Sequence, residues 1–246
     1  MAYVLVACVR SPGRGMSEMR TSVARVARAS SVAVFDVDGT LYGINTLYDF
    51  LERFHAARSR CWWAFFRSAR TLPGKLFWAF VTRVTPGELF RRLAFRSLRG
   101  VDEASLDAAC RVYIRDVLPA HAVEEVVVLL RECRERGYTV LLVSGSIAPL
   151  VREISQALDA DGWFAAAPVT VDHRFTGAIE GDVRGRKLAV VEQAYPEIAD
   201  LVVVTDNRDD LPLIRRADRA WVVSRSKNRT WWQSRALEHV TLIERS

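Results

Sequence analysis

Two aspartates follow an apolar run in the stretch VAVFDVDGTLY. Asp36 and Asp38 are separated by one residue, directly after residues 32–35. Carboxylates this close repel one another and raise each other's pKa. A hard divalent cation such as Mg²⁺ removes the conflict because it binds carboxylate oxygens and keeps several waters. Asp36 could then attack phosphorus as a nucleophile, while Asp38 protonates the leaving oxygen and later activates water.

Polar residues also follow two later apolar runs. Ser144 comes after YTVLLV, and Asp206 and Asp210 come after DLVVVT. The carboxyl ends of parallel strands meet at one edge of a sheet, so these side chains are expected beside Asp36. Ser144 and nearby backbone N–H groups could hold phosphoryl oxygens. Lys187 could neutralise charge that develops in the transition state.

The order of elements along the chain predicts an α/β fold. Strands are expected at 32–36, 138–146 and 200–206, and helices between the later strands imply a parallel sheet covered on both faces. A long helical block separates the first two strands, so it is expected to be a cap inserted at the carboxyl edge of the sheet. The predicted division is a basic, loosely ordered leader at 1–30, a catalytic core at 31–45 and 136–246, and a helical cap at 46–135.

Two smaller elements are also predicted. Residues 168–181 alternate and contain Gly177, which indicates a hairpin. The segment RTWWQSRAL predicts a helix that packs Trp231 and Trp232 on the core, because aromatic pairs are more often buried than exposed.

Four segments together resemble the haloacid dehalogenase superfamily, in the phosphoserine-phosphatase-like branch (subfamily IB) with a helical cap. They are DVDGT, VSGS, the lysine after GDVRG, and TDNRDDLPL, within residues 32–223. The resemblance implies a Rossmann-like three-layer α/β/α core and a Mg²⁺-dependent phosphatase. It implies roles for Asp36 as nucleophile and metal ligand; Asp38 as acid/base, with its carbonyl on the metal; Asp206 as metal ligand; Asp210 behind the metal ligands; and Thr40, Ser144, Gly145 and Lys187 on the phosphate.

The resemblance is not complete. Thr205, Asn207 and Asp209 stand where the family commonly has glycine, serine or glycine, and asparagine. Phosphoserine enzymes carry a substrate-binding glutamate nine residues after the nucleophile, where this chain has Asn45. The missing charge counts against phosphoserine. The acid at Asp38 favours phosphoester cleavage over dehalogenation, because a halide needs no proton.

The expected cap is basic and aromatic. Residues 53–99 hold eleven Lys and Arg but one acid, Glu88, together with many Trp and Phe. Such helices suit a peripheral contact with an anionic membrane; alternatively the aromatics pack the core of the cap. GSIAPLV, TDNRDDLPLI and RAWVV also resemble, more weakly, bacterial phosphatidylglycerophosphate phosphatases of this superfamily, which implies a lipid phosphate substrate.

Composition narrows the remaining choices. The net charge of +6 favours acidic partners, but no nucleic-acid fold signature accompanies it, so no nucleic acid is expected. No apolar run reaches the roughly 18 residues of a membrane span. Four cysteines without metal or disulfide spacing indicate a cytoplasmic protein, with possible contact at the inner face of the membrane. The alternatives left open are a soluble small-molecule phosphatase, a phosphotransferase and a non-catalytic binding module.

Overall fold

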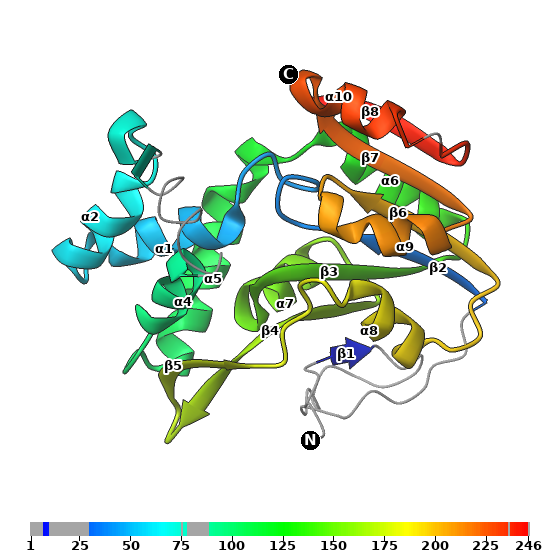
Figure 1. Ribbon diagram of the computed structural model, residues 1–246. Coiled ribbons are helices and arrows are strands. Elements are labelled where there is room, and N and C mark those ends of the chain that lie inside the picture. Colours follow the sequence, from blue (N-terminus) through cyan, green and yellow to red (C-terminus); the bar gives the residue numbers. More distant parts are fainter. Residues whose placement is uncertain (1–6, 10–29, 75, 78–88, 236, 246) are drawn as a thin grey trace.

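A mostly parallel sheet forms the centre of the molecule (Figure 1). The computed structural model describes residues 7–9, 30–74, 76–77, 89–235 and 237–245. Strand order is β1-β4-β3-β2-β6-β7-β8, and β5 pairs with β4. β1–β4 and β4–β5 are antiparallel and the other pairs parallel. The strands are β1 (Ala7–Val9), β2 (Ser31–Phe35), β3 (Thr139–Ile147), β4 (Gly162–Val171), β5 (Arg174–Glu180), β6 (Asp200–Thr205), β7 (Arg219–Arg225) and β8 (Val240–Arg245).

Strand β2 is buried on both faces, which explains its unbroken apolar sequence. Val32 and Val34 face a core shared with α8 (Lys187–Ala194), α9 (Leu211–Arg216) and α10 (Ser226–Gln233). Ala33 and Phe35 face the opposite core. That second core includes residues of α6 (Glu124–Glu135) and α7 (Ala148–Ala157). The predicted α/β fold, with helices on both faces of the sheet, is therefore confirmed.

The helices inserted between β2 and β3 lie mainly to one side of the sheet (Figure 1). They are α1 (Thr46–Ala56), α2 (Arg60–Ser68), α4 (Leu89–Arg96) and α5 (Glu103–Asp116), followed by the short η1 (Leu118–His121) and by α6. Asn45, Ser59 and Asp102 begin α1, α2 and α5, where each side chain accepts a hydrogen bond from a backbone N–H of the first turn. Local capping thus sets where these helices start.

The division into leader, core and cap stays a prediction. Helix α6 packs against β2 and β3, which favours assigning residues 124–135 to the core, although the predicted cap ended at 135. Three residues of the predicted leader form β1 and pair with β4. Apart from Ser30, the rest of that leader lies outside the described residues. Where the structure describes the chain, no helix is long and apolar enough to cross a membrane.

The hairpin predicted at 168–181 is present as β4 and β5, but its turn does not contain Gly177, the residue that indicated it. Asp172 and His173 form the turn with φ of 49° and 60°, the left-handed values of a two-residue hairpin turn. Gly177 instead lets α4 approach, since a Cβ there would lie 3.1 Å from the Cα of Arg96.

The predicted helix near Trp232 is α10, and that indole is buried in the core. Strand β8 was not predicted; it continues the sheet beside β7.

Candidate active site

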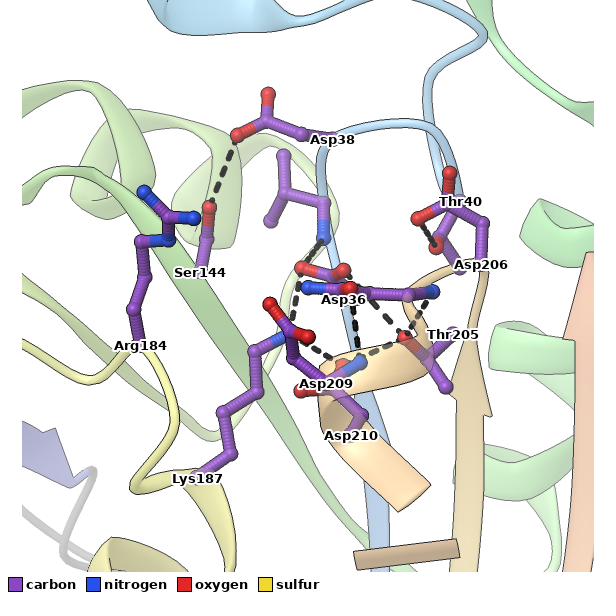
Figure 2. A network of polar contacts seen from close by, with 12 residues as sticks. Asp36, Asp38, Thr40, Ser144, Arg184, Lys187, Thr205, Asp206, Asp209 and Asp210 are labelled. Atoms are coloured by element: carbon purple, nitrogen blue, oxygen red, sulfur yellow. Dashed lines mark hydrogen bonds and ion pairs between the residues drawn. The ribbon is translucent and has the colours of Figure 1, made fainter. Parts of the chain in front are cut away.

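Three parallel strands bring the predicted site residues to one edge of the sheet. β2 pairs with β3 on one side and β6 on the other. Asp36 follows β2, Ser144 lies near the end of β3, and Asp206 follows β6. Figure 2 shows these side chains around a common centre, with Lys187 and Asp210. The convergence expected from the sequence is therefore present.

A buried lysine bridges two carboxylates at the bottom of the site. Lys187 Nζ lies 2.9 Å from Asp36 Oδ1 and 2.8 Å from Asp210 Oδ2. Lys187 is 6 % exposed, which excludes a solvated lysine at the start of α8. Burial, opposed by Lys187 and reinforced by Asp210 and Asp206, raises the pKa of Asp36 to about 7. Burial alone would lower the pKa of Lys187, but Asp36 and Asp210 more than reverse this and raise it.

Thr205 joins this cluster through its hydroxyl group. The Thr205 hydroxyl donates to Asp210 Oδ2 at 2.6 Å and accepts from the Asn207 N–H at 3.1 Å. Its distance to Asp36 Oδ2 is 3.5 Å, too long for a strong hydrogen bond. Sequence reasoning treated Thr205 only as a departure from the family pattern. The sequence did contain a signal for Thr205, because it is a polar residue at the end of an apolar strand, directly before Asp206.

Asp38 is held by different partners from those of Asp36. Its Oδ1 accepts from both the backbone N–H and the hydroxyl of Thr46, each at 2.6 Å. Ser144 Oγ lies 3.3 Å from its Oδ2, and Figure 2 shows Asp38 directed toward Ser144. Burial raises the pKa of Asp38, although the bonds from Thr46 oppose the rise. Sequence reasoning missed Thr46, the first residue of α1.

Asp206 lies against the loop that follows Asp38. Thr40 Oγ1 is 3.4 Å from Asp206 Oδ1, so Thr40 lies beside this carboxylate. A Cβ on Gly39 would lie 2.1 Å from Asp206 Oδ2, and Gly39 has a φ of +80°. Only glycine fits both requirements. Arg245 Nη1 donates to Gly39 O at 2.9 Å, so the unpredicted β8 supports this loop.

The oxygen donors at this edge fit a divalent cation. Burial, opposed by Lys187, raises the pKa of Asp206 to about 6. The pKa of Asp36 is raised as well. Across the described residues, no three His, Cys, Asp or Glu side chains form a metal cluster. The Mg²⁺ site expected from the sequence does not require such a cluster. It uses the carboxylates of Asp36 and Asp206 and the main-chain carbonyl of Asp38. Two carboxylates of raised pKa, buried at Asp36 and half-buried at Asp206, are the environment that a hard cation stabilises.

The phosphate-binding loop predicted at Ser144 and Gly145 is tightly held. Ser144 is buried, and its Oγ accepts from the Ser146 N–H at 3.1 Å. Gly145 O accepts from Arg91 Nη2 at 2.8 Å, and the Arg184 side chain passes close to Gly145. Sequence reasoning assigned no role to Arg91 or Arg184. No local pattern distinguishes them among the many arginines of the chain.

The other departures from the family pattern have local structural roles. Asn207 Oδ1 accepts from the Asp209 N–H at 3.0 Å and caps η2 (Arg208–Asp210). Asp209 is exposed. Asn45 is also exposed, and it caps α1 by accepting from the Tyr48 N–H at 3.0 Å.

The fold and this site agree with the comparisons to known proteins. Residues 33–215 match the haloacid dehalogenase-like hydrolase family, and the chain belongs to this family. A 112-residue stretch is 31 % identical to the phosphoserine phosphatase of Methanocaldococcus jannaschii. The match covers 42 % of this chain and 51 % of that enzyme, so the chain matches about half the length of this curated relative.

Solved structures show the same fold. A Bordetella pertussis Tohama I protein of unknown function aligns with a TM-score of 0.71 and 24 % identity, over 86 % of this chain and 97 % of that one. A substrate-bound phosphoserine phosphatase aligns with a TM-score of 0.54 and 19 % identity, over 80 % and 87 %. The superfamily predicted from the sequence is confirmed by the family match, and the similarity to phosphoserine phosphatases agrees with the predicted branch.

Proposed function

We propose that this protein is a Mg²⁺-dependent phosphomonoesterase that works through an aspartyl-phosphate on Asp36. The observation that carries the proposal is the different partnering of two neighbouring carboxylates. Asp36 contacts the Lys187 ammonium group, whereas Asp38 is held by the hydroxyl and backbone N–H of Thr46. One carboxylate is thus placed beside a cation that attracts phosphate. The other is half-buried, and its partial burial raises its pKa despite the hydrogen bonds from Thr46.

The reaction follows from these positions. A carboxylate oxygen of Asp36 attacks phosphorus, and the bond from phosphorus to the ester oxygen breaks. Asp38 gives its proton to the leaving oxygen. Asp38, now ionised, takes a proton from water, and the resulting hydroxide attacks phosphorus, releasing phosphate and restoring Asp36. Ser144 and Lys187 hold phosphoryl oxygens throughout.

A bound Mg²⁺ would be held by Asp36, Asp206 and the Asp38 carbonyl, and would neutralise charge on the phosphoryl group. Asp210 contributes indirectly, because it contacts Lys187 and Thr205 and so fixes the lysine beside Asp36.

A lipid phosphate is the first candidate substrate. Beyond α2, large apolar side chains are exposed to solvent: Leu72 at 72 %, Leu76 at 66 % and Phe77 at 57 %. Arg67 and Arg70 lie nearby in sequence and are more than half exposed. Apolar side chains flanked by arginines suit insertion into an anionic lipid surface.

A small phosphorylated metabolite such as phosphoserine is the second candidate. The similarity to the Methanocaldococcus jannaschii phosphoserine phosphatase favours it. In addition, several cap aromatics pack on one another: Phe65 stacks on Phe90 with ring centroids 4.8 Å apart, and Phe66 stacks on His55 at 5.9 Å. These aromatics form a core for the cap and need no membrane. Trp78 and Phe80 of the predicted aromatic surface lie outside the described residues.

Phosphate release with Mg²⁺ tests the proposed activity and separates the two substrates. Phosphatidylglycerophosphate in mixed micelles is compared with O-phosphoserine. Asp36→Asn is the inactive reference, and Asp172→Asn at the β4–β5 turn is the matched control. We expect Asp36→Asn to abolish release and Asp172→Asn to retain it. Release of phosphate by Asp36→Asn at the wild-type rate would refute the mechanism.

Binding to vesicles tests the lipid assignment separately. Co-sedimentation with phosphatidylglycerol vesicles is compared between the wild type and a Leu72→Ser, Phe77→Ser double variant. If the substrate is lipid, the variant should bind vesicles less and lose activity on the lipid but not on a soluble aryl phosphate. Equal sedimentation, together with faster turnover of O-phosphoserine, would favour the soluble substrate.

A further inference from the structure

A buried arginine of the cap contacts the loop that is proposed to bind phosphate. Arg91 lies on α4 and is 4 % exposed. Its Nη2 donates to Gly145 O at 2.8 Å and to Asp182 Oδ1 at 2.9 Å. Its Nη1 contacts Asp182 Oδ2. A buried guanidinium is retained only with such partners, because desolvating its charge is costly.

Asp182 is the second half of this link. It lies between β5 and α8, the segment that leads to Lys187. Besides Arg91, its Oδ1 accepts from the Arg184 N–H at 3.1 Å. The Asp182 carboxylate therefore fixes the backbone of the segment that delivers the lysine, and Arg91 fixes the carboxylate.

Two arginine side chains lie close to Gly145. Arg91 binds its carbonyl oxygen. In addition, a Cβ on Gly145 would lie 2.8 Å from Arg184 Cγ and 3.0 Å from Cδ. The Arg184 side chain thus crosses the loop beside Ser144, and Figure 2 shows it next to that serine. Both segments that bear phosphate-binding groups meet at Arg91 and Asp182.

We propose that Arg91 and Asp182 are a pair of positioning residues that couple the cap to the phosphate-binding groups Ser144 and Lys187. The inference rests on the proposed function for the identity of that phosphate site. Both terminal nitrogens of Arg91 bind protein oxygens, so Arg91 can act on the site through Gly145 and Asp182. Because Arg91 of α4 contacts both Gly145 and Asp182, a displacement of α4 would disturb the Ser144 loop and the Lys187 segment together.

Five variants, one of them a control, test this coupling. Arg91→Met keeps an unbranched but shorter side chain and removes the charge, every donor and the contact of the guanidinium with Phe95. Asp182→Asn removes the charge of the partner, and the double variant removes both. Arg92→Met is the matched control, because Arg92 is the next residue of α4 and is exposed. Arg91→Lys keeps a charge in place and serves if Arg91→Met fails to fold, since one ammonium group cannot reproduce the forked contact.

The measurements are kcat/KM on p-nitrophenyl phosphate, the dissociation constant of inorganic phosphate by calorimetry, and Tm. For each single variant we expect at least tenfold weaker phosphate binding and at least tenfold lower kcat/KM. The double variant should be no worse than the poorer single variant, because one interaction is lost in all three. Arg92→Met should stay within twofold of the wild type, and Arg91→Lys should be intermediate.

Four results would overturn the coupling. One is a lowered Tm with unchanged phosphate affinity, which would make the pair merely structural. Another is additive losses in the double variant. The third is a loss confined to substrates that carry a carboxylate, such as O-phosphoserine, which would make Arg91 a substrate-binding residue. Phosphate binding is measured without turnover, so its dependence on Arg91 would stand even if the protein hydrolysed no ester. A wild type that binds no phosphate would refute the coupling.

Discussion

Lys187 Nζ is shared between Asp36 at 2.9 Å and Asp210 at 2.8 Å, and all three side chains are buried. One positive charge therefore faces two carboxylates inside the protein. The pKa of Asp36, raised to about 7 mainly by burial, is held from rising further by this lysine. The ionised nucleophile thus depends on Lys187 in the absence of a metal.

Replacing Lys187 by Met is expected to damage both activity and stability. It leaves Asp36 and Asp210 buried without their cation, which costs on the order of 3–5 kcal/mol for a buried pair. Phosphate release should fall at least 1000-fold, the size of effect expected when a group that stabilises phosphoryl charge is lost. Urea unfolding and phosphate release measure the two effects. Arg215→Met, an exposed position on α9, should change neither, and a similar loss there would contradict the account.

Thr46 is expected to set the protonation of Asp38. Thr46→Val removes a hydroxyl that lies 2.6 Å from Asp38 Oδ1 and that favours the ionised carboxylate. The pKa of Asp38 should therefore rise, and the acidic limb of kcat against pH should move to higher pH when breakdown of the phosphoenzyme limits turnover. Thr46→Ser keeps the hydroxyl and should restore the wild-type profile. An unshifted pH profile of kcat in Thr46→Val would show that Thr46 does not set the protonation of Asp38.

Gly39 and Gly100 offer a matched pair of glycines. Both have φ near +80°, but a Cβ on Gly39 would lie 2.1 Å from Asp206, whereas nothing lies within 4 Å of one on Gly100. Gly100→Ala should cost only the backbone strain, about 1–2 kcal/mol. Gly39→Ala should cost roughly 1–3 kcal/mol more from overpacking and should abolish phosphate release by displacing Asp206. Denaturant unfolding and activity assays check this; equal behaviour of the two variants would contradict the close contact.

His55 is expected to make stability depend on pH. Burial, with a contribution from Arg58, lowers its pKa to about 4, and its Nε2 lies 3.0 Å from Ser97 Oγ. The unfolded chain binds a proton at its ordinary value near 6.5, so the folded state binds fewer protons between pH 6.5 and 4. Stability is therefore fully present above pH 6.5 and should fall by about 3 kcal/mol as pH drops to 4.

Unfolding free energies of the wild type and His55→Gln, measured across that range, isolate this contribution from the titrating carboxylates. The wild type should lose its advantage over the variant as pH falls. Parallel curves would show that His55 titrates normally in the folded protein.

The sequence predicted the parts of the site that lie at strand ends. Asp36, Ser144 and Asp206 each end a buried apolar run, and parallel pairing alone places such residues together. The supporting contacts needed tertiary structure: Thr46 contacts Asp38 because α1 begins beside the loop, and Arg245 reaches Gly39 from a strand of alternating, partly exposed residues. Arg91 is one arginine among many in the cap. Its importance depends on Asp182, which is 91 residues away in sequence.

The β4–β5 hairpin also involves contacts between distant segments, which the local sequence does not reveal. Gly177 indicated a hairpin, but Asp172 and His173 adopt the left-handed turn conformation. The glycine is instead required by α4 passing over the strand, a contact between segments about 80 residues apart that no local pattern reveals.

Acid quenching during turnover tests whether the phosphoryl group passes through Asp36. A substrate with a radiolabelled phosphate is mixed with the protein and Mg²⁺, quenched, and the labelled peptide is sequenced. The account predicts acid-stable, alkali-labile label on the peptide that contains Asp36, and no label in Asp36→Asn. Label on another residue, or undiminished turnover by Asp36→Asn, would contradict it.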